Sequence, residues 1–269
     1  AVSSIAWAPE EDPAIATLLR ARGVQGVELA PTKWRTDPFH APAKDVAALR
    51  RWWEDRGFSI VSLQSLLFEH PELQLFGSDA SRSALASFLK DVLDFAHAVG
   101  AGAVVFGSPK NRLRGALSNV EAMAIAESFL RALGDYARDS GVAFCVEANP
   151  PGYGCDFVTT TAEAVELVRR VNHPGICVNG DLGGMTMAGE DPRSSIEAAR
   201  GLIGHFHASE PNLAEIVAVS DHARAAEGLA TIGYDRWVSI EMRAVADGNH
   251  IAAVDRAVQR VQRAYGSGS

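Results

Sequence analysis

Residues 141–147, GVAFCVE, contain the pattern that decides the fold: a glycine, a short apolar run and a polar residue at its end. A stretch with helical spacing of apolar residues precedes it, and the same order recurs along the chain. Glycine suits a helix C-terminus because it adopts the left-handed conformation without a Cβ clash. The seven glycines of this pattern are Gly23, Gly57, Gly100, Gly141, Gly175, Gly201 and Gly233. The sequence therefore predicts a chain of repeated βα units.

An opening strand over residues 3–7, SSIAW, brings the predicted strands to eight. The 269 residues then divide into units of about 34, and eight such units close into a barrel. The alternative is an open, doubly wound sheet, but the GxGxxG signature of that fold does not follow the first strand. We therefore predict a single (β/α)8 TIM barrel over residues 1–265. We expect residues 266–269, GSGS, to be a tail left from cloning.

Capping residues predict where several helices begin. A carboxylate before a proline, or a hydroxyl three residues before a glutamate, satisfies the free N–H groups of a first turn. The pairs are Asp12 with Pro13, Asp191 with Pro192, Ser118 with Glu121, and Thr160 with Glu163. The last two predict helices that begin near residues 119 and 161.

Composition limits the class of protein. The chain has 33 acidic and 25 basic residues, a net charge of −8, which disfavours a nucleic-acid partner because phosphate backbones are bound through Lys and Arg. Its hydrophobic residues are spread over the chain, with no run near the roughly 20 that a membrane helix needs. Three cysteines without CxxC spacing suit a reducing compartment. We expect a cytoplasmic protein with no membrane partner, and self-association into a homo-oligomer stays open.

Four polar side chains close the last four predicted strands: Glu147, Asp181, His207 and Glu241. With each of them pointing inward, the alternate residues of its strand are apolar and face the helices. They lie roughly 30 residues apart, the length of one βα unit, so they should converge on the C-terminal rim, where barrel enzymes hold their chemistry. Three carboxylates at one mouth would repel each other without a cation. Three oxygen ligands and one imidazole predict one divalent metal, with Mn²⁺ first, Mg²⁺ or Co²⁺ as alternatives and Zn²⁺ still open.

The runs VEAN (146–149), NGDLGG (179–184), HFHASEPN (205–212) and SIEMR (239–243) resemble the xylose isomerase-like barrel superfamily of sugar isomerases and epimerases. The resemblance covers nearly the whole chain and is strongest to the ketose 3-epimerase branch. It implies the same four metal ligands and a sugar or polyol substrate. Two positions depart from that branch, where a histidine and an arginine are usual: this chain has Gly184 and Leu213. The departures leave the identity of the sugar open.

The resemblance and the residues point to the same chemistry. A cation that polarises a carbonyl and its neighbouring hydroxyl stabilises an enediolate, and Glu147 and Glu241 would be the acid–base pair that moves the proton. We predict a metal-dependent sugar or cyclitol isomerase or epimerase. Two alternatives stay open: a lyase similar to 3-dehydroshikimate dehydratase, and a sugar-binding barrel without catalysis. Hydrolysis of abasic DNA is disfavoured, because that branch of the superfamily uses several additional histidines.

Further side chains follow the strand ends and are candidates for substrate contact: Trp7, Glu28, Gln64, Asn149, Tyr153, Glu210 and Arg243. Trp7 and Glu28 could equally serve in packing or as a structural acid, and Tyr153 lies in a Pro/Gly-rich loop that could cover the site. Lys33 and Arg112 lie in rim loops, where they either grip an anionic group of the substrate or remain in solvent. We expect His205 to be hydrogen-bonded beneath His207 rather than to be a fifth ligand.

Overall fold

The computed structural model describes residues 1–217 and 220–266, in which eight parallel strands form a closed barrel in sequence order. The strands are β1 (Val2–Ser3), β2 (Gly26–Leu29), β3 (Ser59–Leu63), β4 (Ala103–Phe106), β5 (Ala143–Glu147), β6 (Ile176–Asp181), β7 (Ile203–Ser209) and β8 (Val238–Glu241). Strand β1 pairs with both β2 and β8, which closes the ring. The predicted TIM barrel is confirmed. The predicted tail at 266–269 lies outside the described residues, apart from Gly266.

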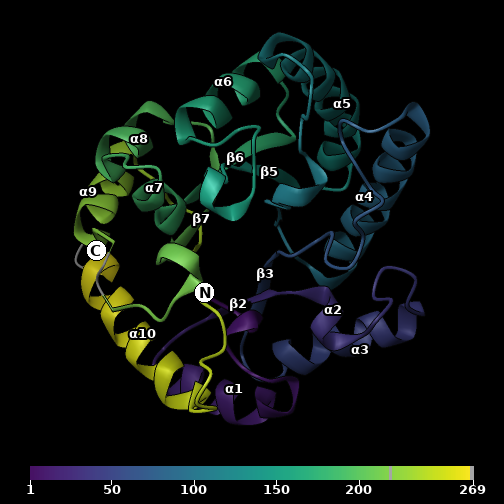
Figure 1. The fold of residues 1–269 in the computed structure, drawn as a ribbon. Helices are drawn as coiled ribbons and strands as arrows, with labels where there is room; N and C mark the ends of the chain where they lie inside the picture. The colour runs from purple at the N-terminus through teal and green to yellow at the C-terminus, as the bar shows by residue number, and fades with distance from the viewer. Residues whose placement is uncertain (218–219, 267–269) are drawn as a thin grey trace.

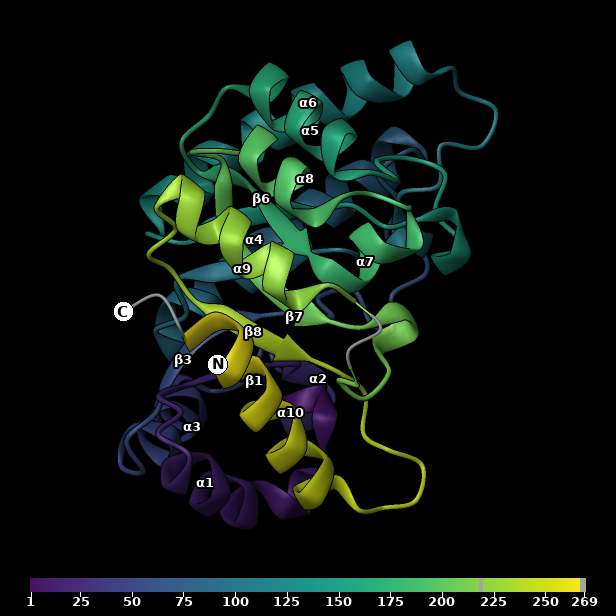
Figure 2. The same cartoon turned by 90° about the vertical axis from the view of Figure 1, so that its left-hand side faces the viewer.

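Helices surround the strands as a ring (Figure 1). They are α1 (Asp12–Ala21), α2 (Pro31–Trp34), α3 (Ala43–Glu54), α4 (Asp79–Val99), α5 (Asn119–Asp139), α6 (Thr161–Val171), α7 (Leu182–Met187), α8 (Pro192–Ala198), α9 (His222–Ile232) and α10 (His250–Tyr265). The last helix, α10, lies beside α1 in both views (Figure 2), and Arg22 Nε pairs with Asp255 Oδ1 at 2.6 Å between them. The first and the last helix of the ring, α1 and α10, therefore lie side by side where the ring closes. No helix in the described part of the chain combines the length and apolar character that a membrane crossing requires.

The apolar core lies between the strands and the helices. Phe144, Val178, Phe206 and Ile240, which the alternation predicted to face outward, are buried within it. The opposite face of the strands lines the barrel axis. There a Cβ added to Gly204 would lie 2.7 Å from Cys145 Sγ. The strands thus keep apolar groups on the helix side and leave the interior for small and polar ones.

The first strand is shorter than predicted. Residues 3–7 were expected to be extended, but the strand ends at Ser3 and a 3₁₀ turn covers Ser4–Ala6. The backbone carbonyls of Ser4 and Trp7 accept hydrogen bonds from Lys33 Nζ instead of from a neighbouring strand. A tertiary contact therefore replaces the strand pairing that the local pattern suggested.

Two local predictions about helix ends were wrong, and both have a physical reason. Gly175 does not have a positive φ. Instead α6 ends at Val171 and its C-cap, Asn172, has φ 46°, while a Cβ on Gly175 would lie 2.4 Å from the carbonyl oxygen of Gly134. Asp12 does not cap α1 from outside. It is the first residue of that helix, and its Oδ1 accepts a hydrogen bond from Trp7 Nε1 at 2.7 Å.

The other predicted caps are present. Ser118 and Glu121 form the complete capping box at the start of α5, and Asp191 accepts from Ser194 N at 2.8 Å before α8. Thr160 caps α6 as expected. Its partner Glu163 binds the backbone N–H of Thr159 at 2.6 Å.

Candidate metal centre

The four side chains that close the late strands meet at one point of the barrel. Glu147, Asp181 and Glu241 are the last residues of β5, β6 and β8, and His207 lies in β7. One ligand atom from each lies within 4.8 Å of the others. His207 Nδ1 is at the centre, 3.1 Å from Glu241 Oε2, 3.2 Å from Glu147 Oε1 and 3.8 Å from Asp181 Oδ2. We call these four residues the carboxylate–histidine cluster.

The electrostatics of this cluster favour a cation. Burial and the nearby charges of Glu147 and Glu241 raise the pKa of Asp181 to about 8. Burial also raises the pKa of Glu241. Burial works against a charged His207, but Glu241 and Glu28 outweigh it and hold the pKa of His207 well above its usual value. Three carboxylates and one imidazole that share so little space hold protons unless a cation replaces them, so the donor set fits a divalent metal.

Side chains from neighbouring strands and loops position Glu147. Asn179 Nδ2 donates to Glu147 Oε1 at 2.7 Å, and Asn149 Nδ2 lies 3.3 Å from Oε2. Gly107 allows this approach, because a Cβ there would lie 2.4 Å from Glu147 Oε2. The carboxylate is thus fixed by two amides and by the lack of a side chain opposite it.

Arg112 stabilises the backbone around Glu147. It is 1% exposed, and it donates to the backbone carbonyls of Gly107 at 2.7 Å, Glu147 at 2.5 Å and Phe157 at 3.3 Å. The sequence offered an anion-binding role or a solvated one for this arginine, and the structure shows neither. Lys33 likewise turns its ammonium to the carbonyls of Ser4 and Trp7.

Asp181 uses its two oxygens differently. Oδ1 accepts from Gly184 N at 2.5 Å and so caps α7, whereas Oδ2 accepts from Ser209 Oγ at 2.6 Å. A Cβ on Gly184 would lie 2.9 Å from Asp181 Oδ1, so a side chain at this position would crowd the carboxylate. Sequence reasoning assigned no role to Ser209 or Asn179. Their inward position on β7 and β6 was the only signal that could have identified them.

A buried polar network lies on the far side of His207. Glu28 is fully buried, and its Oε2 lies 2.6 Å from Ser62 Oγ, 2.8 Å from His205 Nε2 and 3.1 Å from His207 Nε2. Gln64 Nε2 donates to Glu28 Oε1 at 3.1 Å and to Ser3 Oγ at 2.6 Å. His205 is hydrogen-bonded in this network, in the position that the sequence favoured for it.

Tyr153 and Asn149 belong to the loop that follows β5. The hydroxyl of Tyr153 accepts a hydrogen bond from Asn212 N at 2.9 Å, which joins this loop to the loop after β7. Burial and the charge of Asp181 raise the pKa of Tyr153 to about 12. Tyr153 therefore lies close enough to the cluster to feel its charge.

The remaining candidates lie around the rim. Trp7 is 1% exposed and packs with Lys33 over its ring at 5.8 Å. Glu210 is fully buried and accepts from the backbone N–H of Ser220 at 2.6 Å, so it holds the loop after β7. Arg243 is exposed, and its backbone N–H donates to Leu213 O at 2.8 Å. Their roles as substrate contacts stay predictions.

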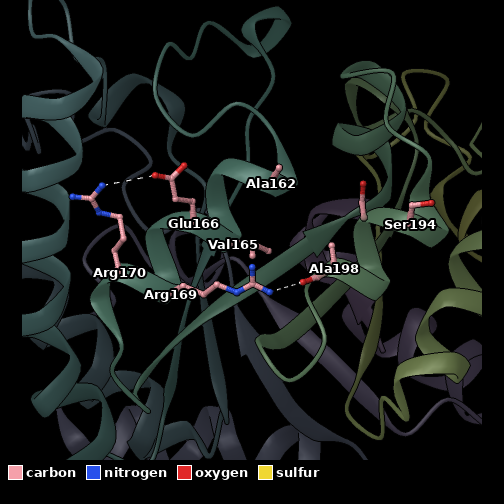
Figure 3. A pocket seen from close by; sticks show the side chains of 8 residues that line it. Ala162, Val165, Glu166, Arg169, Arg170, Ser194 and Ala198 are labelled. Atoms are coloured by element: carbon pink, nitrogen blue, oxygen red, sulfur yellow. Dashed lines mark hydrogen bonds and ion pairs between the residues drawn. The ribbon is translucent and has the colours of Figure 1, made fainter.

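A separate groove of about 550 Å³ lies on the helix layer between α6 and α8 (Figure 3). Val165, Arg169, Ser194 and Ala198 are among its lining residues, and Arg169 Nη2 donates to Ala198 O at 3.0 Å. None of its lining residues belongs to the carboxylate–histidine cluster. The groove is therefore a feature of the helix layer, separate from the candidate metal centre.

Comparison with known proteins gives a consistent result. Residues 16–263 match the model of the family described as xylose isomerase-like TIM barrel. No protein with a curated description matches the chain in sequence.

Solved structures match over nearly the whole chain, at identities that indicate the fold alone. D-psicose 3-epimerase from Clostridium cellulolyticum H10 is 17% identical with a TM-score of 0.80, covering 99% of this chain and 98% of that one. The 3-keto-D-glucoside 4-epimerase from E. coli is 15% identical with a TM-score of 0.78, covering 97% and 98%. The IOLI protein with a bound zinc atom is 18% identical with a TM-score of 0.72, covering 94% and 93%.

Proposed function

Because the chain belongs to the xylose isomerase-like TIM barrel family, we propose that it is a divalent-metal-dependent isomerase or epimerase of a sugar or cyclitol. One observation carries the proposal. Glu147 and Glu241 approach the same nitrogen of His207, at 3.2 and 3.1 Å, from two strands that are not neighbours in the barrel. A substrate held at this point would have a carboxylate on each side of it.

The surroundings of the two glutamates suit opposite roles. Glu147 accepts hydrogen bonds from the amides of Asn179 and Asn149, which hold its carboxylate in place, as a base requires. Burial raises the pKa of Glu241, so this residue retains a proton more readily and suits an acid. In one direction Glu147 removes the proton from the carbon beside the carbonyl and Glu241 returns a proton. The roles exchange in the reverse reaction.

The cluster residues would hold the cation, and its charge would stabilise the enediolate that this proton transfer creates. Three oxygen donors and one nitrogen favour Mn²⁺, with Mg²⁺ or Co²⁺ as alternatives and Zn²⁺ open. Proteins with the same fold support the reaction class, since two of them are described as epimerases of a ketose and of a keto-glucoside. The further side chains that we propose for substrate contact are Trp7, Gln64, Asn149, Tyr153, Glu210 and Arg243. For Glu28 we propose the other role that the sequence left open, that of a structural acid.

Isotope exchange tests this function. We would incubate the Mn²⁺-loaded protein with ketoses, keto-glycosides and keto-cyclitols in D₂O, and follow the products by NMR and mass spectrometry. We expect solvent deuterium at the carbon next to the carbonyl, no exchange after chelation of the metal, and exchange that is slower by about 10²-fold or more with Glu241→Gln. Absence of exchange with every compound, in a protein shown to bind Mn²⁺, would contradict the proposal and favour a sugar-binding barrel.

The same experiment separates the lyase alternative. An isomerase or epimerase returns a product whose mass differs from the substrate only by the deuterium gained, whereas a dehydratase releases water. A product lighter than its substrate by one water would show that the protein eliminates water from the enediolate instead of isomerising the substrate.

A further inference from the structure

We propose that Glu28 is a positioning residue of the metal centre: its carboxylate accepts the Nε2 proton of His207 and thereby presents the lone pair of Nδ1 to the cation. This inference rests on the proposed function only in taking the carboxylate–histidine cluster as the cation site. The proposal concerns how the ligand is oriented, not which residues bind the metal.

The His207 ring lies between two sets of carboxylate acceptors. Nδ1 faces the three carboxylates of the cluster at 3.1 to 3.8 Å, and Nε2 faces Glu28 Oε2 at 3.1 Å. A neutral imidazole carries one proton, and the partner of one nitrogen decides which nitrogen is free to bind a metal. An ionised carboxylate can only accept, so Nε2 must be the donor. Once a cation replaces the second proton of the imidazole, Nδ1 presents its lone pair to the cluster.

Hydrogen bonds prevent the Glu28 carboxylate from rotating away from His207. Ser62, His205 and Gln64 donate to its two oxygens at 2.6, 2.8 and 3.1 Å. All of these side chains are buried, and Gln64 is fixed in turn by Ser3. The rings of His205 and His207 stand perpendicular, 5.2 Å apart, so both can reach the same oxygen. The carboxylate is held in one orientation by donors from two other strands.

Burial of the Glu28 charge has a cost in free energy. A fully buried carboxylate pays a large desolvation penalty, which is recovered only when donors satisfy both oxygens. An apolar residue at position 28 would avoid that penalty. Its neighbours on the same strand, Val27 and Leu29, are apolar and buried. A charged acceptor behind His207 also raises the basicity of the imidazole and so strengthens its bond to a metal. Orientation and basicity of His207 therefore give the buried charge a use.

Glu28→Gln tests the proposal, because it keeps the size of the side chain and removes the charge. We expect the affinity for Mn²⁺, measured by EPR titration, to fall about 10- to 100-fold. The matched control is Glu190→Gln, which alters another carboxylate with two protein donors, Thr161 N and Ser195 Oγ, away from the cluster. This control should bind Mn²⁺ as the parent protein does.

A second readout follows the histidine directly. In the Zn²⁺-loaded parent protein, ¹⁵N NMR should show His207 protonated at Nε2 and metal-bound at Nδ1, and Glu28→Gln should shift the Nε2 signal or broaden it by faster proton exchange. If Glu28→Gln does not fold, Ser62→Ala serves instead. It removes the shortest hydrogen bond to Glu28 and should shift the same signal, with an affinity loss of up to about tenfold.

The outcomes separate this proposal from the proposed function. Wild-type affinity and an unchanged His207 spectrum in Glu28→Gln would overturn the positioning role, even if the protein epimerises a sugar. A metal on Nε2 in the parent protein, held by Glu28 and His205, would overturn it as well. Weaker Mn²⁺ binding with the expected spectrum would support the role, even if no sugar undergoes exchange.

Discussion

The two halves of the barrel contribute different things to one site. Strands β5 to β8 supply all four side chains of the carboxylate–histidine cluster. Strands β2 and β3 supply Glu28, Ser62 and Gln64, which lie behind His207 and are fully or almost fully buried. The late half therefore provides the groups that would hold a cation, and the early half provides the hydrogen bonds that orient one of them.

This division indicates that the candidate metal site draws on strands from both halves of the barrel. His207 is carried by β7, but the orientation of its ring depends on β2, three places away around the ring. Mutations in the late half should therefore remove chemistry or metal. Mutations in the early half should loosen the geometry or lower the stability while the ligands remain.

The largest effect should come from the late half. Glu241→Gln removes one of the two groups that move the proton, so turnover should fall by about 10²- to 10⁴-fold. The measurement is the rate of deuterium incorporation into the best substrate, with Mn²⁺ binding determined in parallel. Glu190→Gln serves as the control. An unchanged rate would remove Glu241 from the acid–base pair and break the comparison between the halves.

The next effect is a dependence of metal binding on pH. Burial and the charges of Glu147 and Glu241 raise the pKa of Asp181 to about 8, so below that pH a proton competes with the cation. Mn²⁺ affinity should fall about tenfold for each pH unit below 8. The sign for stability is opposite: the metal-free protein gains stability from this proton at low pH and loses it as the pH rises through 8. Mn²⁺ titrations and urea unfolding at pH 6, 7, 8 and 9 check both, and equal affinities at pH 6 and 8 would contradict them.

A change on the early side of the ring should affect stability more than chemistry. Arg112 lies in the loop after β4, and Arg112→Met leaves the carbonyls of Gly107 and Glu147 without this donor. We expect a loss of about 1–3 kcal/mol in the free energy of unfolding, with one Mn²⁺ still bound. Arg50→Met is the control, because Arg50 forms an exposed pair with Glu54 and should change stability by less than about 0.5 kcal/mol. Equal losses in the two variants would remove the bracing role of Arg112.

The smallest expected effect is at the loop contact over the mouth. Tyr153→Phe keeps the ring and removes the acceptor for Asn212 N, so stability should fall by about 0.5–1.5 kcal/mol. Hydrogen exchange at the Asn212 amide should become faster, while Mn²⁺ affinity stays constant. A drop in Mn²⁺ affinity would show that this loop takes part in metal binding and would sharpen the boundary between ligand and support.

The sequence predicted the barrel and the cluster because both follow from local rules. Period-two alternation decides which residues face inward, and the C-terminal ends of parallel strands meet on one rim, so Glu147, Asp181, His207 and Glu241 could be brought together without coordinates. Predictions failed where a distant group decides the outcome. Lys33 donates hydrogen bonds to the backbone carbonyls that a longer β1 would have used in strand pairing. Trp7 donates to the Asp12 carboxylate that was expected to cap α1.

The supporting residues were harder to identify for the same reason. The sequence placed Arg112 only as a cation in a loop. The structure shows that its side chain donates to three backbone carbonyls. Glu28 reads as a strand-end acid that could equally touch a substrate. Its link to His207 joins positions 179 residues apart in the chain, a distance over which no sequence pattern operates.

Asp181 connects the metal centre to a helix. One oxygen closes the first turn of α7 through the amide of Gly184, and the other lies on the side of His207 and Ser209. A cation bound to this carboxylate would weaken its hydrogen bond to the helix end, and by thermodynamic linkage each event would change the free energy of the other by the same amount. The chemical shift of the Gly184 amide would therefore report occupancy of the candidate centre from outside the ligand set.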